Sequence, residues 1–88
     1  MRYNFPRIRF ADISTVGQQL KHIESEFVEA AHEYNSGRMD LCDLEVMDIY
    51  QSCETYFRIR EKQGISINEV DLQTYEKNKA RGYYDAES

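Results

Sequence analysis

Apolar residues recur at helical spacing over residues 14–34, and this pattern predicts the first helix of the chain. Either Asp12 or Ser14 is expected to cap its start, because short polar side chains accept hydrogen bonds from the first free backbone N–H groups. Asn35-Ser36-Gly37 should end it, with Gly37 in a left-handed conformation. The stripe that defines this helix consists of Val16, Leu20, Ile23, Phe27, Ala30 and Tyr34.

A second helix is predicted from a cap at Asp40 to about Lys62, where Gly64 stops it. At about 100° per residue, this helix is apolar on two sides. A helix of this kind usually lies centrally, with neighbours on both sides. One side carries Leu41, Leu44, Ser52, Thr55, Tyr56 and Ile59, together with Glu45 and Asp48, and the other carries Cys42, Val46, Ile49, Cys53 and Phe57.

A third and shorter helix should start at Ser66 or Asn68 and run to about Ala80, where Gly82 ends it. The sequence therefore predicts an all-α fold, in which a helical hairpin is followed by a short C-terminal helix. No repeat or composition shift divides the chain, so one domain is expected.

That single domain spans residues 1–88, with an extended N-terminal arm at 1–11 and a frayed tail at 85–88. A chain of 88 residues buries only a modest part of its surface. One hairpin partner and a short third helix are too little to cover both apolar sides of the second helix. The pattern therefore predicts a homodimer or homotetramer with a four-helix-bundle-type core.

Charge is unevenly distributed along the chain, and its sign argues against one class of function. The net charge is −5, and the stretch from Asp12 to Glu54 holds ten acidic residues against two basic ones, Lys21 and Arg38. Nucleic-acid binding needs a basic footprint, so it is not expected as the main activity.

Cys42 and Cys53 lie eleven residues apart without a metal-binding spacing, and we expect both to be buried thiols. No apolar run approaches the ~20 residues of a membrane span. No signal peptide is recognisable at the start of the sequence. A cytoplasmic protein without a membrane partner is expected.

Two acid pairs at i,i+3 spacing carry the candidate chemistry. Glu26 and Glu29 lie on the first predicted helix, and Glu45 and Asp48 lie on the second. The second pair falls within an apolar stripe, and residues 39–57 contain no Lys or Arg to neutralise it. A carboxylate cluster of this kind needs protons or a cation, and oxygen ligands suit Mg²⁺ or Mn²⁺.

The order of these acids is also that of a known motif. Glu26-x-x-Glu29, fifteen intervening residues and Glu45-x-x-Asp48 resemble the EExxE–spacer–ExxD pattern of the all-α nucleoside triphosphate pyrophosphohydrolases, the MazG-like superfamily. The resemblance covers roughly residues 14–84. It implies that all four acids are metal ligands.

The C-terminal part supports the same resemblance. "KQGISINEV" followed by "YEKNKARGYY" is similar to the end of the family's last helices, where an Asn-x-x-Arg pair faces the nucleotide phosphates. The matching residues are Asn78 and Arg81. Two positions depart from the pattern: Ser25 replaces the first Glu, and Thr74 replaces a Lys for which Lys77 can substitute.

The resemblance implies cleavage of the α–β phosphoanhydride of a nucleoside triphosphate, which yields a monophosphate and pyrophosphate. An acidic site can hold a polyphosphate only through bridging cations, which also stabilise the leaving group and acidify an attacking water. Glu29 is additionally the candidate base. Lys77, Asn78 and Arg81 are the candidate substrate-binding residues.

Two alternatives remain open. The departures at Ser25 and Thr74 are compatible with a MazG-like fold that has lost catalysis and serves as an interaction module. A di-iron four-helix bundle is the other alternative, with Glu29, His32 and Glu45 as its half-site. Against it, His32 falls nearly opposite the apolar stripe of its helix.

Overall fold

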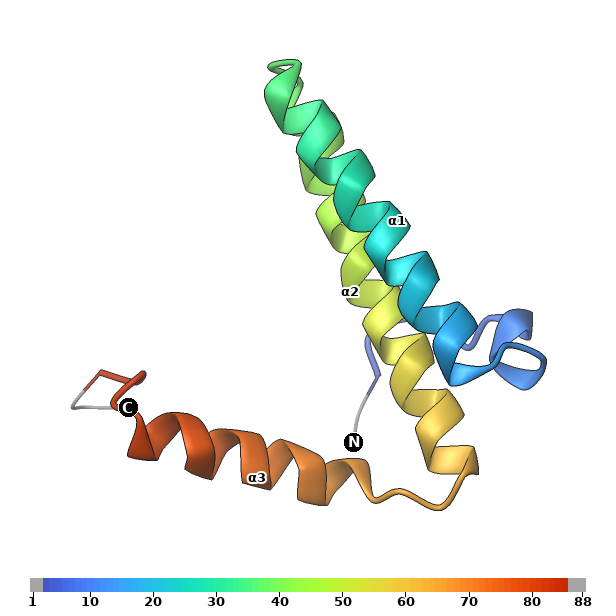
Figure 1. Ribbon diagram of the computed structural model, residues 1–88, viewed down its shortest axis with the longest axis vertical. Helices are drawn as coiled ribbons and strands as arrows, with labels where there is room; N and C mark the ends of the chain where they lie inside the picture. Colours follow the sequence, from blue (N-terminus) through green and yellow to red (C-terminus); the bar gives the residue numbers. More distant parts are fainter. Residues whose placement is uncertain (1–2, 86–88) are drawn as a thin grey trace.

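The computed structural model describes residues 3–85, apart from the side chain of Phe10, and every regular element in this range is helical. Two long antiparallel helices lie side by side as a hairpin, and the third helix runs away from it (Figure 1). The all-α class and the three predicted helices are therefore confirmed. The elements are η1 (Arg9–Asp12), α1 (Val16–Asn35), α2 (Met39–Lys62) and α3 (Ile67–Ala80).

The cap predicted for α1 is wrong. Thr15 caps the helix: its hydroxyl accepts from the backbone N–H of Gln18, whose side chain accepts in return from the N–H of Thr15. This is a capping box with Gln at its fourth position. Asp12 instead lies in η1, where its carboxylate is paired with Arg7 and Lys62.

The cap predicted for α2 is also wrong, because the helix starts before Asp40. Arg38 occupies the cap position without a side-chain hydrogen bond to the helix. Its guanidinium spans the turn instead and donates from Nε to Glu33 Oε2 over 2.7 Å. Gly37 adopts the predicted left-handed conformation at φ 77°, so the chain reverses within a short turn.

The link between α2 and α3 sets the direction of α3. Gly64 is left-handed at φ 89°, and the N–H of Ile65 donates to the carbonyl of Arg60 over 3.1 Å. This pattern is a Schellman cap, which satisfies the last carbonyls of α2. Ser66, one of the two predicted caps, then starts α3, and Ile67 is buried at the junction.

The N-terminal arm, residues 3–8, is held on α2 by a buried carboxylate. The backbone N–H groups of Asn4 and Phe5 donate to the two oxygens of Glu54 over 2.9 and 3.0 Å. Arg58 donates to the carbonyl of Phe5 over 2.8 Å and lies over the ring of Tyr3. The arm is thus packed on the body as expected, although its end coils into η1 instead of remaining extended.

The hairpin has an unusual distribution of polarity. Where α1 meets α2, the buried residues are mostly polar, and we call this contact the seam. Several apolar residues that define the predicted stripes are instead exposed, because a single hairpin leaves the outer sides of both helices uncovered. The buried polar residues are Gln19, Glu26, Ser52, Glu54 and Thr55, whereas Leu20, Phe27, Tyr34, Leu41, Leu44 and Val46 are exposed.

The chain is also more extended than a domain of its length. Its radius of gyration is 15.3 Å, against about 12 Å for a compact domain of this size. Among the described residues, the buried apolar set is small: Ala11, Ala30, Ile59 and Ile67. None of the described helices is long and apolar enough to cross a membrane.

Candidate functional site: the carboxylate seam

The seam is built around Glu26, whose carboxylate is almost completely covered. The hydroxyl of Ser52 donates to Glu26 Oε1, and His22 Nε2 lies 3.3 Å from the same oxygen. Gln19 Nε2 donates to the carbonyl of Ser52 over 2.9 Å and ties the two helices together. Buried polar groups of this kind are tolerated because each has a partner.

Glu29 of α1 and Glu45 of α2 lie close enough to influence each other electrostatically. The pKa of Glu45 is raised, first by desolvation and then by the neighbouring Glu29 carboxylate. Asp48 and Glu26 add smaller electrostatic contributions in the same direction, so all four predicted acids act on one another.

The four carboxylates converge without forming a finished ligand set. Within residues 3–85, no three His, Cys, Asp or Glu side chains are grouped as ligands of one metal ion. Glu26 is directed to Ser52 and His22, and Asp48 is exposed rather than buried in the predicted stripe. Repulsion between like charges accounts for this spread, because four acids without a cation avoid a common centre.

The chemistry of these donors nevertheless fits a hard divalent cation. Carboxylate oxygens are the ligands that Mg²⁺ and Mn²⁺ prefer. A cation bound beside Glu29 and Glu45 would offset the repulsion between their carboxylates. Residues 39–57 contain no Lys or Arg that would do so instead. Glu29, Glu45 and Asp48 would hold the ion, with Glu26 beside them.

The predicted substrate-binding residues are not near these acids within one chain. Lys77, Asn78 and Arg81 lie at the C-terminal end of α3. That helix does not pack against α1, and it meets α2 only near the junction (Figure 1). Arg81 lies over the ring of Tyr83, 4.3 Å from its centroid. The structure therefore does not assemble the two halves of the predicted site.

The di-iron arrangement is not assembled either. His32 is exposed, as its position on the helix predicts. Glu29 and Glu45 face each other across the seam, but no third ligand joins them among the described residues.

Sequence reasoning missed two partners of Glu26. Ser52 was placed on the correct side of α2, but only as part of an apolar stripe. The i,i+4 spacing of His22 and Glu26 was the readable signal for the other partner. The anchor of the arm, Glu54, was also missed, although Arg58 follows it by four residues on the same helix face.

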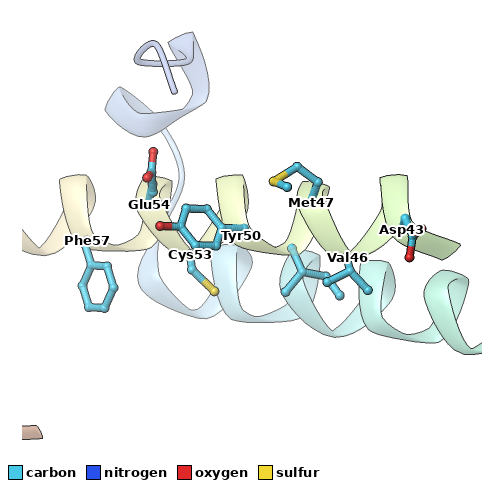
Figure 2. A pocket seen from close by; sticks show the side chains of 8 residues that line it. Asp43, Val46, Met47, Tyr50, Cys53, Glu54 and Phe57 are labelled. Atoms are coloured by element: carbon cyan, nitrogen blue, oxygen red, sulfur yellow. The ribbon is translucent and has the colours of Figure 1, made fainter. Parts of the chain in front are cut away.

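An apolar groove of about 680 Å³ lies on the outer side of α2. All the side chains that line it come from this one helix (Figure 2). Cys53 is one of them, and both it and Cys42 are free and half-buried, so the prediction of fully buried thiols is wrong. The lining residues are Asp43, Val46, Met47, Ile49, Tyr50, Cys53, Glu54 and Phe57.

Comparisons of the chain with protein-family models, curated proteins and solved structures find no match. The resemblance to the MazG-like superfamily is therefore carried by the motif residues of this chain alone.

Proposed function

We propose that this protein is a Mg²⁺- or Mn²⁺-dependent nucleoside triphosphate pyrophosphohydrolase that releases a nucleoside monophosphate and pyrophosphate. The observation that carries the proposal is the raised pKa of Glu45, which desolvation and the charges of Glu29, Asp48 and Glu26 all increase, in a stretch of α2 without Lys or Arg. Repulsion between neighbouring carboxylates is unfavourable in a purely structural role and useful at a cation site.

The divalent cation, when bound, supplies charge neutralisation at the phosphates and lowers the pKa of a coordinated water. Glu29, Glu45 and Asp48 would hold it. Glu29 also accepts a proton from the attacking water. Glu26 keeps the seam in register through Ser52, because this bond links α1 to α2.

The basic end of α3 supplies the substrate contacts. Lys77 and Arg81 bind phosphate oxygens by charge-assisted hydrogen bonds, and Asn78 donates alongside them. None of these three is engaged by an acid of the hairpin, so they are available to a polyphosphate.

A homodimer or homotetramer is part of the proposal. Leu20, Phe27 and Tyr34 recur every seven residues on the exposed side of α1, a spacing that suits the contact between helices of a bundle. Two hairpins joined there form the four helices of the core. The assembly covers apolar surface that the single chain leaves in water.

A nucleotide panel tests the activity. The purified protein is incubated with each ribo- and deoxyribonucleoside triphosphate in Mg²⁺, Mn²⁺ or EDTA, and the products are separated by anion exchange. Monophosphate and pyrophosphate in equal amounts, abolished by EDTA, are the expected products. Release of orthophosphate would contradict the position of cleavage.

The same preparation separates the alternatives. Absence of turnover with every nucleotide, in a folded protein, would favour the non-catalytic interaction module. Bound iron with a visible absorption band would favour the di-iron bundle formed by Glu29, His32 and Glu45.

A further inference from the structure

The groove on α2 is a binding surface without an occupant in the chain described here. Val46, Cys53 and Phe57 project along one side of α2, and no side chain of α1 or α3 joins the lining (Figure 2). Aliphatic, aromatic and thiol groups make up most of the surface. An apolar groove that lies open along one helix is a candidate contact site.

Helix α3 has a matching free surface. Leu72 and Tyr75 are exposed on it. The ring of Tyr75 stacks on that of Tyr84 with a centroid distance of 5.3 Å, which widens the apolar ridge. The α3 helix has 14 residues, about 21 Å in length. The groove runs from Asp43 to Phe57, which is also about 21 Å along α2.

The charges of the two surfaces are complementary. The hairpin carries most of the acids of the chain, and Asp43 lies at one end of the groove. Lys77, Lys79 and Arg81 gather at the C-terminal end of α3. Opposite potentials steer two such surfaces together and select their orientation.

The chain's own α3 is not positioned to fill the groove. The cap at Gly64 and Ile65 directs α3 away from α2, and the burial of Ile67 fixes the junction. We infer that the groove of each copy receives α3 of a second copy, so that two chains exchange their C-terminal helices. This arrangement covers both apolar surfaces at once and accounts for the extended shape of the single chain.

The exchange has a consequence for the site, and this part rests on the proposed function. The groove adjoins the seam on α2, since Cys53 lines the groove and follows Ser52, whose hydroxyl donates to Glu26 in the seam. An α3 helix docked there brings Lys77, Asn78 and Arg81 of one chain towards the acids of the other. The two halves of the site, separate within one chain, would meet between chains.

Cysteine cross-linking tests the docking independently of any activity. In a Cys42→Ser background, native Cys53 reports from the groove, and Leu72→Cys or Tyr75→Cys reports from the ridge of α3. After mild oxidation, we expect a disulfide between Cys53 and the new thiol that joins two chains, identified by non-reducing electrophoresis and peptide mapping. Gln73→Cys, on another side of α3, is the matched control and should not cross-link to Cys53.

Each other result overturns the inference. A disulfide within one chain would show that α3 folds back on its own groove. A Cys53–Cys53 bridge would show that two grooves face each other. No cross-link from either ridge variant, in samples with wild-type helicity, would show that the groove is not the docking site of α3.

Mixing two impaired variants tests the shared site. Asp48→Asn lacks a ligand and Arg81→Ala lacks a phosphate contact, but an exchanged dimer of the two contains one intact site. We expect a mixture to recover about a quarter of wild-type activity, because half of the dimers are mixed and half of their sites are intact. No recovery while the cross-link forms would limit α3 to an assembly role, and an inactive wild type with the cross-link would reject only the proposed function.

Discussion

The two faces of α2 are opposite in character. Its inner face, at the seam, is polar and covered by α1, whereas its outer face is the open apolar groove. In an ordinary two-helix hairpin the apolar side chains face inward. Here the hairpin is held by bonds such as Gln19 to Ser52, and its apolar surface remains free. We therefore assign the proposed chemistry to the seam and the proposed association to the outer face.

The largest expected effect comes from comparing the same Asp→Asn substitution at a seam position and at a groove position of α2. Asp48→Asn should reduce hydrolysis more than ~100-fold, since loss of a metal ligand removes charge stabilisation that the reaction requires. Asp43→Asn makes the same change on the groove side of α2 and should leave turnover close to wild type. Steady-state kinetics with Mg²⁺ on both variants provides the measurement.

Melting temperatures of the same two variants test whether the seam binds a cation. The wild type should melt at a higher temperature in millimolar Mg²⁺ than in EDTA, because a cation that binds only the folded state adds about 2.7 kcal/mol at a hundredfold excess over Kd. Asp48→Asn should lose most of this shift, and Asp43→Asn should keep it. A wild type that is indifferent to metal would refute the cation site and the activity with it.

The next effect concerns the groove. Phe57→Asp places a charge where an apolar partner is expected, and a carboxylate buried without a partner costs several kcal/mol. We expect the groove to bind α3 of the second copy less tightly, so that the mass in light scattering at micromolar concentration falls below that of the wild type. Leu44→Asp, at another exposed apolar position of α2, is the control and should retain the wild-type mass.

Arg81→Ala should have a smaller effect on catalysis than loss of a metal ligand. A charge-assisted hydrogen bond contributes about 1.5–3 kcal/mol, so kcat/KM should decrease on the order of ten- to hundredfold. Lys79→Ala, its neighbour on α3, should change kcat/KM much less. The metal-dependent melting shift should be the same in both variants, and unchanged kinetics would identify Arg81 as a solvated surface charge.

The sequence predicts the helices of this fold better than it predicts which face of each helix is buried. The helices were predictable, because apolar spacing and the glycines at 37, 64 and 82 define their lengths and ends. The caps of α1 and α2 were misassigned, although Thr15-x-x-Gln18 is a readable capping-box pattern, whereas Ser66 of α3 was among the predicted caps. The partners of each face were not predictable. A helical wheel ranks Leu20 and Phe27 as core positions, whereas Gln19 and Glu26 are the buried residues.

The candidate site shows the same division. The sequence predicts which acids belong together, and in the structure Glu29, Asp48 and Glu26 all contribute to the raised pKa of Glu45. The sequence did not reveal that α3 points away from these acids. That direction depends on the turn at Gly64 and Ile65 and on the burial of Ile67. Local capping can be read from a sequence, but the angle between two helices depends on packing.

A moderate effect on stability is expected from the arm. Glu54→Gln preserves shape but replaces the carboxylate that accepts both backbone N–H groups of the arm, those of Asn4 and Phe5. Loss of charge-assisted bonds should lower the free energy of unfolding by about 1–3 kcal/mol, measured by urea denaturation. Glu61→Gln removes an exposed contact to Tyr3 and should cost less. Equal effects would show that the arm is not anchored at Glu54.

The smallest expected effect is a dependence on pH that belongs to the seam alone. Because the folded state raises the pKa of Glu45 above its unfolded value, folding favours the protonated form. Its contribution to stability is therefore complete below the unfolded pKa, which is about 4.3 for a free Glu, and is lost as the pH rises through the folded pKa. Glu45→Gln cannot titrate, so its melting temperature in EDTA should increase relative to wild type across that rise.

Asp12, which lies outside the seam in η1, does not disturb this measurement of the Glu45 pKa. Asp12 has its pKa lowered to about 2 by hydrogen bonds from Arg7 and Lys62, so its contribution disappears only in stronger acid and does not interfere near neutrality. Adding Mg²⁺ should restore the wild type at the upper end of the pH range and not Glu45→Gln, because a bound cation offsets the repulsion between the carboxylates. A difference between Glu45→Gln and wild type that does not change with pH would mean that the acids of the seam do not act on one another. The two faces of α2 would then differ in burial and polarity, and the seam would not be a candidate cation site.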